Sequence, residues 1–243
     1  MSAPPPATRL NGWRFLNPRL WLSFLLMMAR SASEKAFGVE YAQYHRILRR
    51  LVLDGGCTSV LDVGCGERSP LAFFANEIPY RVGVDAHEGS IEKSRAANIH
   101  TAYVVSNVTE IGKRFSPGSF DCVLLLEVIE HLPREGGASL LAQCERIARK
   151  RVVASTPNGF VEQASTPENP FQAHISGWTT ADFTVRGYEV TGVAGWKFLR
   201  GPLMRPKWKP HAVFSRISML TEPWFENRPH NAFQILCVKK LSD

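Results

Sequence analysis

The chain has 243 residues, 44% of them hydrophobic and 21% charged, which is an ordinary globular composition with enough length to bury a large core. Its five cysteines are scattered and form no C-x-x-C pair, so the sequence indicates neither a zinc site nor a disulfide framework and favours a reducing, cytoplasmic setting. The net charge of +7 is uneven. Ten of the 29 cations lie in two acid-free segments, before Glu34 and between Glu189 and Glu222, and the rest of the chain holds 19 cations against 22 acids.

The N-terminal region is predicted to be separate from the main domain. Residues 1–16 contain three consecutive prolines and are expected to form a flexible arm. The apolar run Leu20–Ala29 follows Asn17-Pro18, a helix-start signal, and has about half of the ~20 residues that span a bilayer. For this run, a cleaved secretion signal is the less favoured alternative. A second helix is expected over Glu34–Leu53. The sequence therefore predicts two regions: an arm with a helical lid or docking segment (1–54), and the main domain (55–243).

Short apolar runs alternate with helical patterns through the main domain. Such alternation predicts right-handed βαβ units, and hence a Rossmann-like, doubly wound α/β sheet of about seven strands, mostly parallel with an antiparallel last strand and with helices on both faces. The expected strands are Ser59–Val63, Arg81–Val84, Ala102–Val105, Asp121–Leu126, Arg151–Ala154, Tyr188–Val193 and Phe233–Val238. The expected helices are Pro70–Asn76, Ser90–Asn98 and Ala138–Ala148.

A glycine turn follows the first expected strand, in V-L-D-V-G-C-G-E-R-S-P at Val60–Pro70. Glycines between a parallel strand and a helix start let a ligand approach the backbone, where bare N–H groups favour a negative charge. The dinucleotide fingerprint needs a third glycine where this chain has Ser69, which weakens a nicotinamide interpretation. Asp85 ends the next strand, where an acid accepts hydrogen bonds from ribose hydroxyls. The residues alone thus predict a nucleoside-bearing ligand, and a tight turn without a ligand is the alternative.

Four motifs in order resemble the class I S-adenosylmethionine-dependent methyltransferases. They are V-L-D-V-G-C-G, V-G-V-D-A at Val82–Ala86, F-D-C-V-L-L-L-E-V-I-E-H-L at Phe120–Leu132 and V-V-A-S-T-P-N at Val152–Asn158. The resemblance covers residues 55–195 and implies S-adenosyl-L-methionine as the cofactor. It also implies a cofactor role for nine residues: Asp62, Gly64, Cys65, Gly66, Asp85, Ala86, Asn107, Val108 and Glu127. Asp62, Gly64 and Gly66 are expected to flank the methionine part, Asp85 to hold the ribose and Ala86 to lie beside the adenine. Asn107 is expected at the adenine amine, where its amide oxygen can accept a hydrogen bond, and Glu127 is expected to face the sulfonium. Asn107 stands where the family usually has an acid.

Two histidines are candidates for the base that an oxygen or nitrogen acceptor needs. His131 directly follows E-V-I-E after the fourth strand, and His174 lies in the loop N-P-F-Q-A-H-I-S-G-W, which we expect to close over the acceptor. A structural histidine is the alternative for each. Glu127, Glu130 and His131 are spaced to converge on one helical turn and can hold a divalent cation there, although family members use this segment without a metal.

The segment E-V-I-E-H-L-P, followed by S-T-P-N and by the loop with His174, resembles small-molecule O-methyltransferases such as the ubiquinone-biosynthesis group. This resemblance implies an O-methyltransferase acting on a small-molecule or lipid-linked acceptor. The two basic segments also carry aromatics, so we predict peripheral membrane contact, with solvated loops as the alternative. A nucleic-acid substrate is disfavoured, because the basic charge lies outside the central domain. Another N-methyltransferase, or a catalytically silent S-adenosylmethionine-binding regulatory protein, stays open.

Overall fold

The computed structural model describes residues 42–241, except for the side chain of Leu203. The expected arm, the expected helix at Leu20–Ala29 and the first part of the helix expected over Glu34–Leu53 lie outside the described residues. Helix α2 spans Ala42–Leu53 and ends before Gly55 and Gly56, as the sequence predicts. Although the sequence analysis grouped it with the N-terminal region, α2 packs on the sheet through Tyr44, Ile47, Leu48 and Val52.

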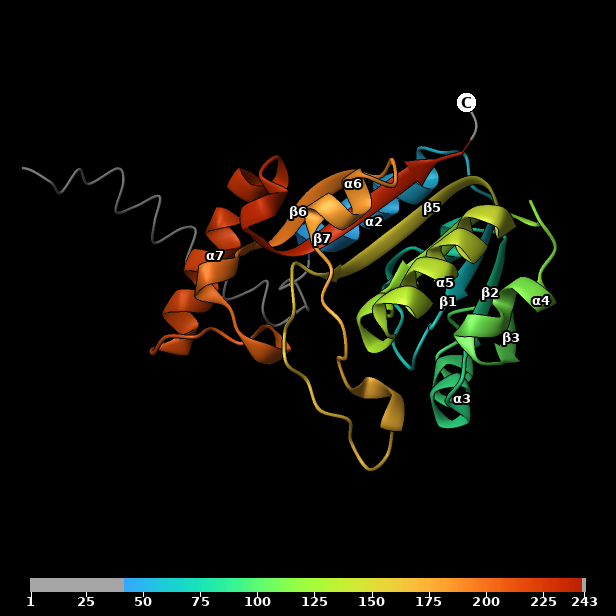
Figure 1. Cartoon of the computed structure of the whole chain (residues 1–243), viewed down its shortest axis with the longest axis horizontal. Coiled ribbons are helices and arrows are strands. Elements are labelled where there is room, and N and C mark those ends of the chain that lie inside the picture. Colours follow the sequence, from blue (N-terminus) through green and yellow to red (C-terminus); the bar gives the residue numbers. More distant parts are fainter. Residues whose placement is uncertain (1–41, 242–243) are drawn as a thin grey trace, which may run out of the picture. The chain divides into compact units, whose positions relative to one another are not determined.

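Seven strands form one sheet in the order β3-β2-β1-β4-β5-β7-β6 (Figure 1). The pairs from β3 through β5 are parallel, whereas β7 runs antiparallel to both β5 and β6. The order reverses between β1 and β4, so a ligand crevice is expected at the carboxyl ends of those strands. This arrangement confirms the predicted fold class. The strands are β1 (Ser59–Val63), β2 (Tyr80–Asp85), β3 (Ala102–Val105), β4 (Phe120–Leu126), β5 (Ala148–Pro157), β6 (Glu189–Trp196) and β7 (Ala232–Lys240).

Helices cover both faces of the sheet. Figure 1 shows α5 and α6 in front of the sheet and α2 behind it. Because β4 is covered on both sides, its whole sequence is apolar apart from Asp121, and every residue of it is buried. The helices besides α2 are α3 (Glu88–Ala96), α4 (Ile111–Arg114), α5 (Arg134–Ile147), α6 (Thr180–Thr184) and α7 (His211–Glu226).

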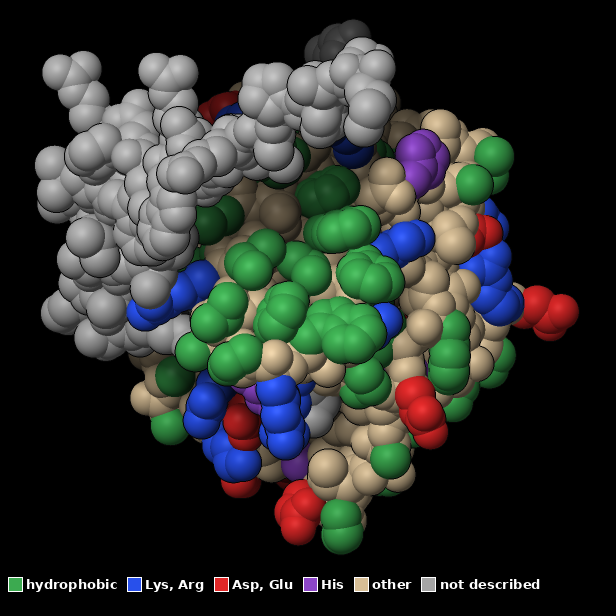
Figure 2. Space-filling view, turned by 90° about the vertical axis from the view of Figure 1, so that its left-hand side faces the viewer, with side chains coloured by type: hydrophobic (Ala, Val, Ile, Leu, Met, Phe, Trp, Pro, Cys, Tyr) green, Lys and Arg blue, Asp and Glu red, His purple; other side chains and the backbone are tan. Residues whose placement is uncertain are grey.

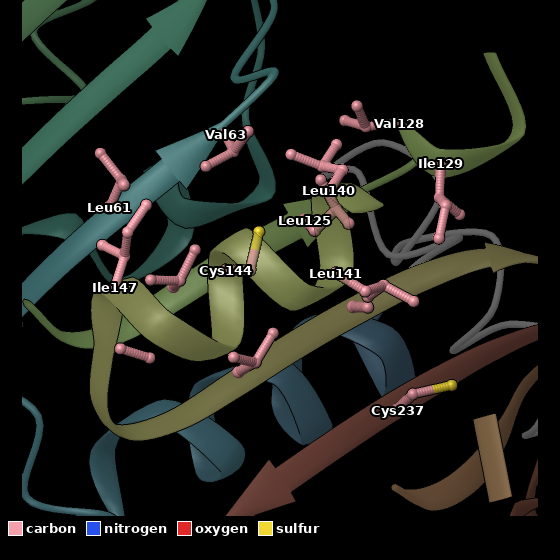
Figure 3. Close-up of a cluster of buried hydrophobic side chains, with 14 of the residues drawn as sticks. Leu61, Val63, Leu125, Val128, Ile129, Leu140, Leu141, Cys144, Ile147 and Cys237 are labelled. Atoms are coloured by element: carbon pink, nitrogen blue, oxygen red, sulfur yellow. The ribbon is translucent and has the colours of Figure 1, made fainter. Parts of the chain in front are cut away.

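Alternate side chains of each central strand point to opposite faces, which gives two cores. Figure 3 shows the core under α5, where residues of the helix meet one face of β1 and β4. Its members on α5 are Leu140, Leu141, Cys144 and Ile147, and its strand members include Leu61, Val63 and Leu125. The second core joins α2 to the opposite face. Both cores support the carboxyl ends of β1 and β4 rigidly.

Some sequence-based expectations for helices are wrong. The segment expected to be a helix at Pro70–Asn76 forms two 3-10 turns instead, Pro70–Phe73 and Ala75–Glu77. Helix α7 was not predicted between the last two strands. It buries Ser215 and Ser218 rather than an apolar stripe, so its sequence lacks the usual signal of a core-facing helix. The short helices α4 and α6 were also missed, because one helical turn carries too little periodicity to recognise.

Candidate active site

The glycine turn at the end of β1 is shaped by packing on one side and by open space on the other. Gly64 has φ of +71°, and a Cβ there would lie 2.4 Å from Cγ2 of Val128. Gly66 has φ of +57°, and a Cβ there would meet nothing within 4 Å. The absence of a side chain at Gly64 therefore lets Val128, in the loop after β4, pack against the turn. The absence of a side chain at Gly66 leaves space beside the turn where a ligand is expected.

Asp62 holds this turn from within the protein. The residue is 1% exposed, and Oδ2 accepts hydrogen bonds from Ser69 Oγ at 2.5 Å and from His100 Nε2 at 2.9 Å. Ser69 also caps the following 3-10 turn by accepting from the Leu71 N–H. We infer that Asp62 positions the turn rather than presenting its carboxylate to a ligand. The sequence analysis missed His100, because a histidine beyond a helix gives no sign of which acid it will contact.

Cys65 faces inward. Its side chain is buried, and a Cβ on Gly83 would lie 3.0 Å from its Sγ. Burial raises the pKa of the Cys65 thiol well above its usual range, so the thiol stays protonated. Its backbone N–H donates to Val84 O at 3.0 Å. Any contact of Cys65 with a ligand therefore comes from its backbone.

The side chain of Asp85 is held in one orientation at the carboxyl end of β2. Its Oδ2 accepts from the Gly66 N–H at 2.9 Å, and its Oδ1 accepts from the His87 N–H at 2.8 Å. Each carboxylate oxygen keeps a second lone pair for another donor. The half-buried Ala86 lies between Asp85 and the start of α3. This geometry suits two neighbouring ribose hydroxyls, so the predicted role of Asp85 is physically possible.

Asn107 does not offer its amide oxygen as the sequence analysis expected. Its Oδ1 already accepts from the Thr109 N–H at 3.0 Å and from Thr109 Oγ1 at 2.9 Å, because Asn107 caps the turn at Val108–Glu110. Both lone pairs of this oxygen are therefore engaged, and an adenine amine would have to displace one of the two Thr109 donors. Asn107 is exposed and Val108 half-buried, and their place near an adenine stays a prediction.

Glu127 stands directly after β4 in a left-handed conformation, with φ of +55°. Its Oε1 accepts from Ser155 Oγ at 2.8 Å and from Gln234 Nε2 at 2.7 Å. Tyr44 extends the network, since its hydroxyl lies 2.9 Å from Ser155 Oγ. Burial raises the pKa of Glu127. Tyr44, Ser155 and Gln234 come from α2, β5 and β7, and nothing in the sequence indicated that they would meet.

The structure brings together the two histidines that the sequence singled out. His131 and His174 form an edge-to-face pair with ring centroids 4.7 Å apart. Nδ1 of His131 lies 2.9 Å from Ala173 O, and Nδ1 of His174 lies 2.7 Å from Val161 O. Desolvation lowers the pKa of both rings, with each ring's backbone hydrogen bond opposing it, so both are neutral at pH 7. The loop carrying His174 is tied to the 3-10 turn Ile129–His131, which follows β4, because Ile175 and Ser176 donate their N–H groups to Glu130 O.

The structure changes, by one member, the group of residues that the sequence analysis considered as an alternative cation site. The sequence analysis grouped Glu127, Glu130 and His131. Among the described residues, the three that offer ligand atoms within 4.8 Å of one another are Glu130, His131 and His174. His174 replaces Glu127 because the loop after β5 folds back over the end of β4. Sequence spacing finds ligands on one turn but not a ligand supplied by a distant loop.

Comparison with known proteins matches the part of the chain that runs from β1 into β5. A family of methyltransferase domains matches residues 61–154. A probable S-adenosylmethionine-dependent methyltransferase of Mycolicibacterium smegmatis is 28% identical over 163 residues, which is 64% of this chain and 61% of that relative. The match thus spans less than two thirds of the relative's length.

Solved structures share the fold at low identity. A SAM dependent methyltransferase from Archaeoglobus fulgidus has a TM-score of 0.53 at 20% identity and covers 87% of this chain and 99% of its own. The methyltransferase domain of a bacterial Hen1 has a TM-score of 0.54 at 17% identity, with 84% and 100% covered. Magnesium protoporphyrin IX methyltransferase from Synechocystis, solved with bound SAM, has a TM-score of 0.51 at 16% identity, with 86% and 83% covered.

Proposed function

We propose that this chain, which belongs to the class I S-adenosylmethionine-dependent methyltransferases and uses S-adenosyl-L-methionine as its cofactor, methylates a hydroxyl oxygen of a small or lipid-linked acceptor. The observation that supports an oxygen acceptor is the histidine pair. Because each Nδ1 bonds a carbonyl oxygen, it carries the proton, and each Nε2 keeps a lone pair. Neutral imidazoles at the end of β4 are suited to take a hydroxyl proton.

The reaction is an in-line displacement at the methyl carbon. The C–S bond of the sulfonium breaks as the C–O bond forms, the hydroxyl proton passes to an imidazole Nε2, and neutral S-adenosylhomocysteine remains. The donor is already activated, so most of the rate enhancement comes from aligning the oxygen with the methyl group and sulfur. The packing of Val128 against Gly64 fixes the loop of His131 to the turn expected to hold the cofactor.

A cavity of about 560 Å³ is lined in part by the segment after β5 that leads to His174, and it is a candidate acceptor pocket. Val161, whose carbonyl oxygen holds His174, is one of its lining residues. Most of the other walls are aromatic or cationic, which suits an acceptor that combines an apolar body with a negative group. These residues include Phe160, Trp196, Lys197, Phe198, Lys207 and Phe233.

A lipid-linked acceptor is supported by the outer face of α7. The helix buries serines and exposes Val213, Ile217, Leu220 and Trp224, which lie on one stripe, with Trp224 69% exposed. We call these four residues the α7 stripe. Figure 2 shows a broad hydrophobic area on this side of the molecule with Lys and Arg at its borders. Trp196, Phe198 and Trp208 are also exposed, in the acid-free segment between Glu189 and Glu222. No helix among the described residues is long and apolar enough to span a bilayer.

We expect the α7 stripe to bind vesicles that contain anionic lipid. Aromatic side chains suit the headgroup region, and each nearby Lys or Arg adds about 1 kcal/mol of attraction to an anionic surface. In co-sedimentation with vesicles of phosphatidylcholine and phosphatidylglycerol, Trp224→Glu is expected to weaken binding about tenfold or more, because it places a negative charge in the stripe.

Val185→Glu is the matched control, since Val185 is an 80% exposed apolar residue outside the stripe. It should bind vesicles as the unaltered protein does, and added salt should weaken binding of both. Absence of binding at low salt, or an equal loss in both variants, contradicts a lipid-docking role for α7.

The acceptor class is tested by supplying hydroxyl, amine and short RNA acceptors and measuring S-adenosylhomocysteine. The hydroxyl and amine compounds are matched in size, and mass spectrometry locates the methyl group on the product. Oxygen methylation of the small hydroxyl compound supports the proposed function. Turnover with amines or RNA alone favours the N-methyltransferase or nucleic-acid alternative. Cofactor binding without turnover on any acceptor favours the silent binding protein.

A further inference from the structure

The side chain of Glu130 is buried, with 2% of the residue exposed. Among residues 42–241, neither of its carboxylate oxygens has a hydrogen-bond partner. A buried carboxylate in this state is strongly disfavoured unless a proton or a cation compensates its charge. Burial and the negative charge of neighbouring Glu127 raise the pKa of Glu130. Neither glutamate forms a salt bridge with any residue from 42 to 241. Among these residues, no cationic side chain therefore compensates the charge of either carboxylate.

The two neighbouring imidazoles are arranged as metal-binding histidines are in proteins. Such a histidine usually donates its second ring N–H to a carbonyl or carboxylate oxygen, which fixes the tautomer and orients the ring. Nδ1 of His131 and Nδ1 of His174 both bond backbone carbonyl oxygens, at 2.9 and 2.7 Å. Both Nε2 lone pairs are thereby left as ligands.

The three side chains lie close enough to share an ion. A ligand atom of each lies within 4.8 Å of the others. Metal–ligand bonds of about 2.0–2.2 Å place the ligands of one ion roughly 3–4 Å apart, so modest side-chain rotations close the site. Ile175 and Ser176 donate their N–H groups to the Glu130 carbonyl oxygen, so the loop already holds His174 beside the turn that carries Glu130 and His131.

We propose that Glu130, His131 and His174 bind one divalent transition-metal ion. Two imidazoles and one carboxylate favour Zn²⁺, Co²⁺, Fe²⁺ or Mn²⁺ over Mg²⁺ and Ca²⁺, which prefer all-oxygen sites. Three protein ligands leave coordination positions open, as in catalytic rather than structural metal sites. The competing explanation is a proton held between Glu127 and Glu130, with the histidines serving only as bases.

Binding of the ion does not depend on the proposed function, but its role does. If the acceptor is a hydroxyl compound, its oxygen occupies an open position on the ion. The positive charge then lowers the pKa of the hydroxyl, whose proton leaves to water before the oxygen attacks the methyl carbon. The histidines would act as ligands, and the ion would take over the activation that neutral imidazoles otherwise supply.

The test titrates Co²⁺ into the full chain after treatment with a chelator and dialysis. The visible d–d absorption reports occupancy of an imidazole-containing site. We expect saturation at one equivalent, with binding weakened at least tenfold in each of Glu130→Gln, His131→Ala and His174→Ala. His211→Ala is the matched control, because it removes an exposed imidazole on α7 and should leave the titration unchanged. S-adenosylhomocysteine binding by each variant shows whether it is folded.

The outcomes separate this proposal from the proposed function. Saturable binding that all three variants lose supports the site even if no hydroxyl acceptor is methylated, in which case the proposed function alone fails. Titrations of His174→Ala that match the unaltered protein, or an unaltered protein without a saturable signal, overturn the site. Methylation of a hydroxyl at full rate in excess chelator overturns the catalytic role of the ion and leaves the proposed function standing.

Discussion

Replacing Asp85 with alanine is expected to weaken S-adenosylmethionine binding by about 1.5–3 kcal/mol, or roughly ten- to a hundredfold. This is the scale of hydrogen bonds to a charged group. The N–H groups of Gly66 and His87 orient the carboxylate, so its remaining lone pairs face a donor without further rearrangement. Calorimetric titration of S-adenosylmethionine and of S-adenosylhomocysteine into both proteins measures the difference.

Glu88→Ala is the matched control for this substitution, because it removes an exposed acid from the first turn of α3. We expect the control to bind the cofactor normally. A melting curve separates a binding defect from lost structure, since the substitution also leaves the Gly66 and His87 N–H groups without their acceptor. Unchanged affinity in a folded Asp85→Ala protein would remove Asp85 from the site.

The sheet was predictable because its signals are local. Each central strand is a short apolar run, and the turn at Gly64 and Gly66 requires positive φ, which glycine adopts at little cost. The position of Asp85 at the end of β2 was predictable for the same reason, whereas its role in binding stays a prediction. Helix α7 was not predictable, because its exposed face is apolar and its buried face carries serines. Periodicity indicates which residues share a face, but not whether that face meets the protein.

The side-chain partners at the site were less accessible to sequence reasoning. The roles of Asp62 and Asn107 depend on His100 and Thr109, which take up oxygens that the sequence left available. The pairing of His131 with His174 depends on a loop that the Glu130 carbonyl oxygen holds in place. Such contacts come from tertiary folding, so sequence reasoning proposes candidate residues but not the partners that hold them.

His174→Ala is expected to lower turnover by roughly a hundredfold or more while leaving cofactor affinity unchanged. The His174 ring packs against His131, which follows β4. It makes no part of the hydrogen bond between Asp85 and the Gly66 N–H, which therefore stays intact in the variant. Activation of the acceptor should therefore fail without loss of the cofactor site. Steady-state kinetics with a methylated acceptor, together with S-adenosylhomocysteine calorimetry, measures both quantities.

Gln172→Ala is the matched control for His174→Ala, because Gln172 is an exposed polar residue of the same loop. Its turnover should stay near that of the unaltered protein. Added Mn²⁺ at millimolar concentration distinguishes the two ways in which His174 can act. A metal site that has lost one ligand binds more weakly and is refilled by excess ion, so turnover of His174→Ala should recover in part. A missing general base is not replaced by the ion. Near-normal turnover of His174→Ala without added metal would assign activation to His131 or to no histidine at all.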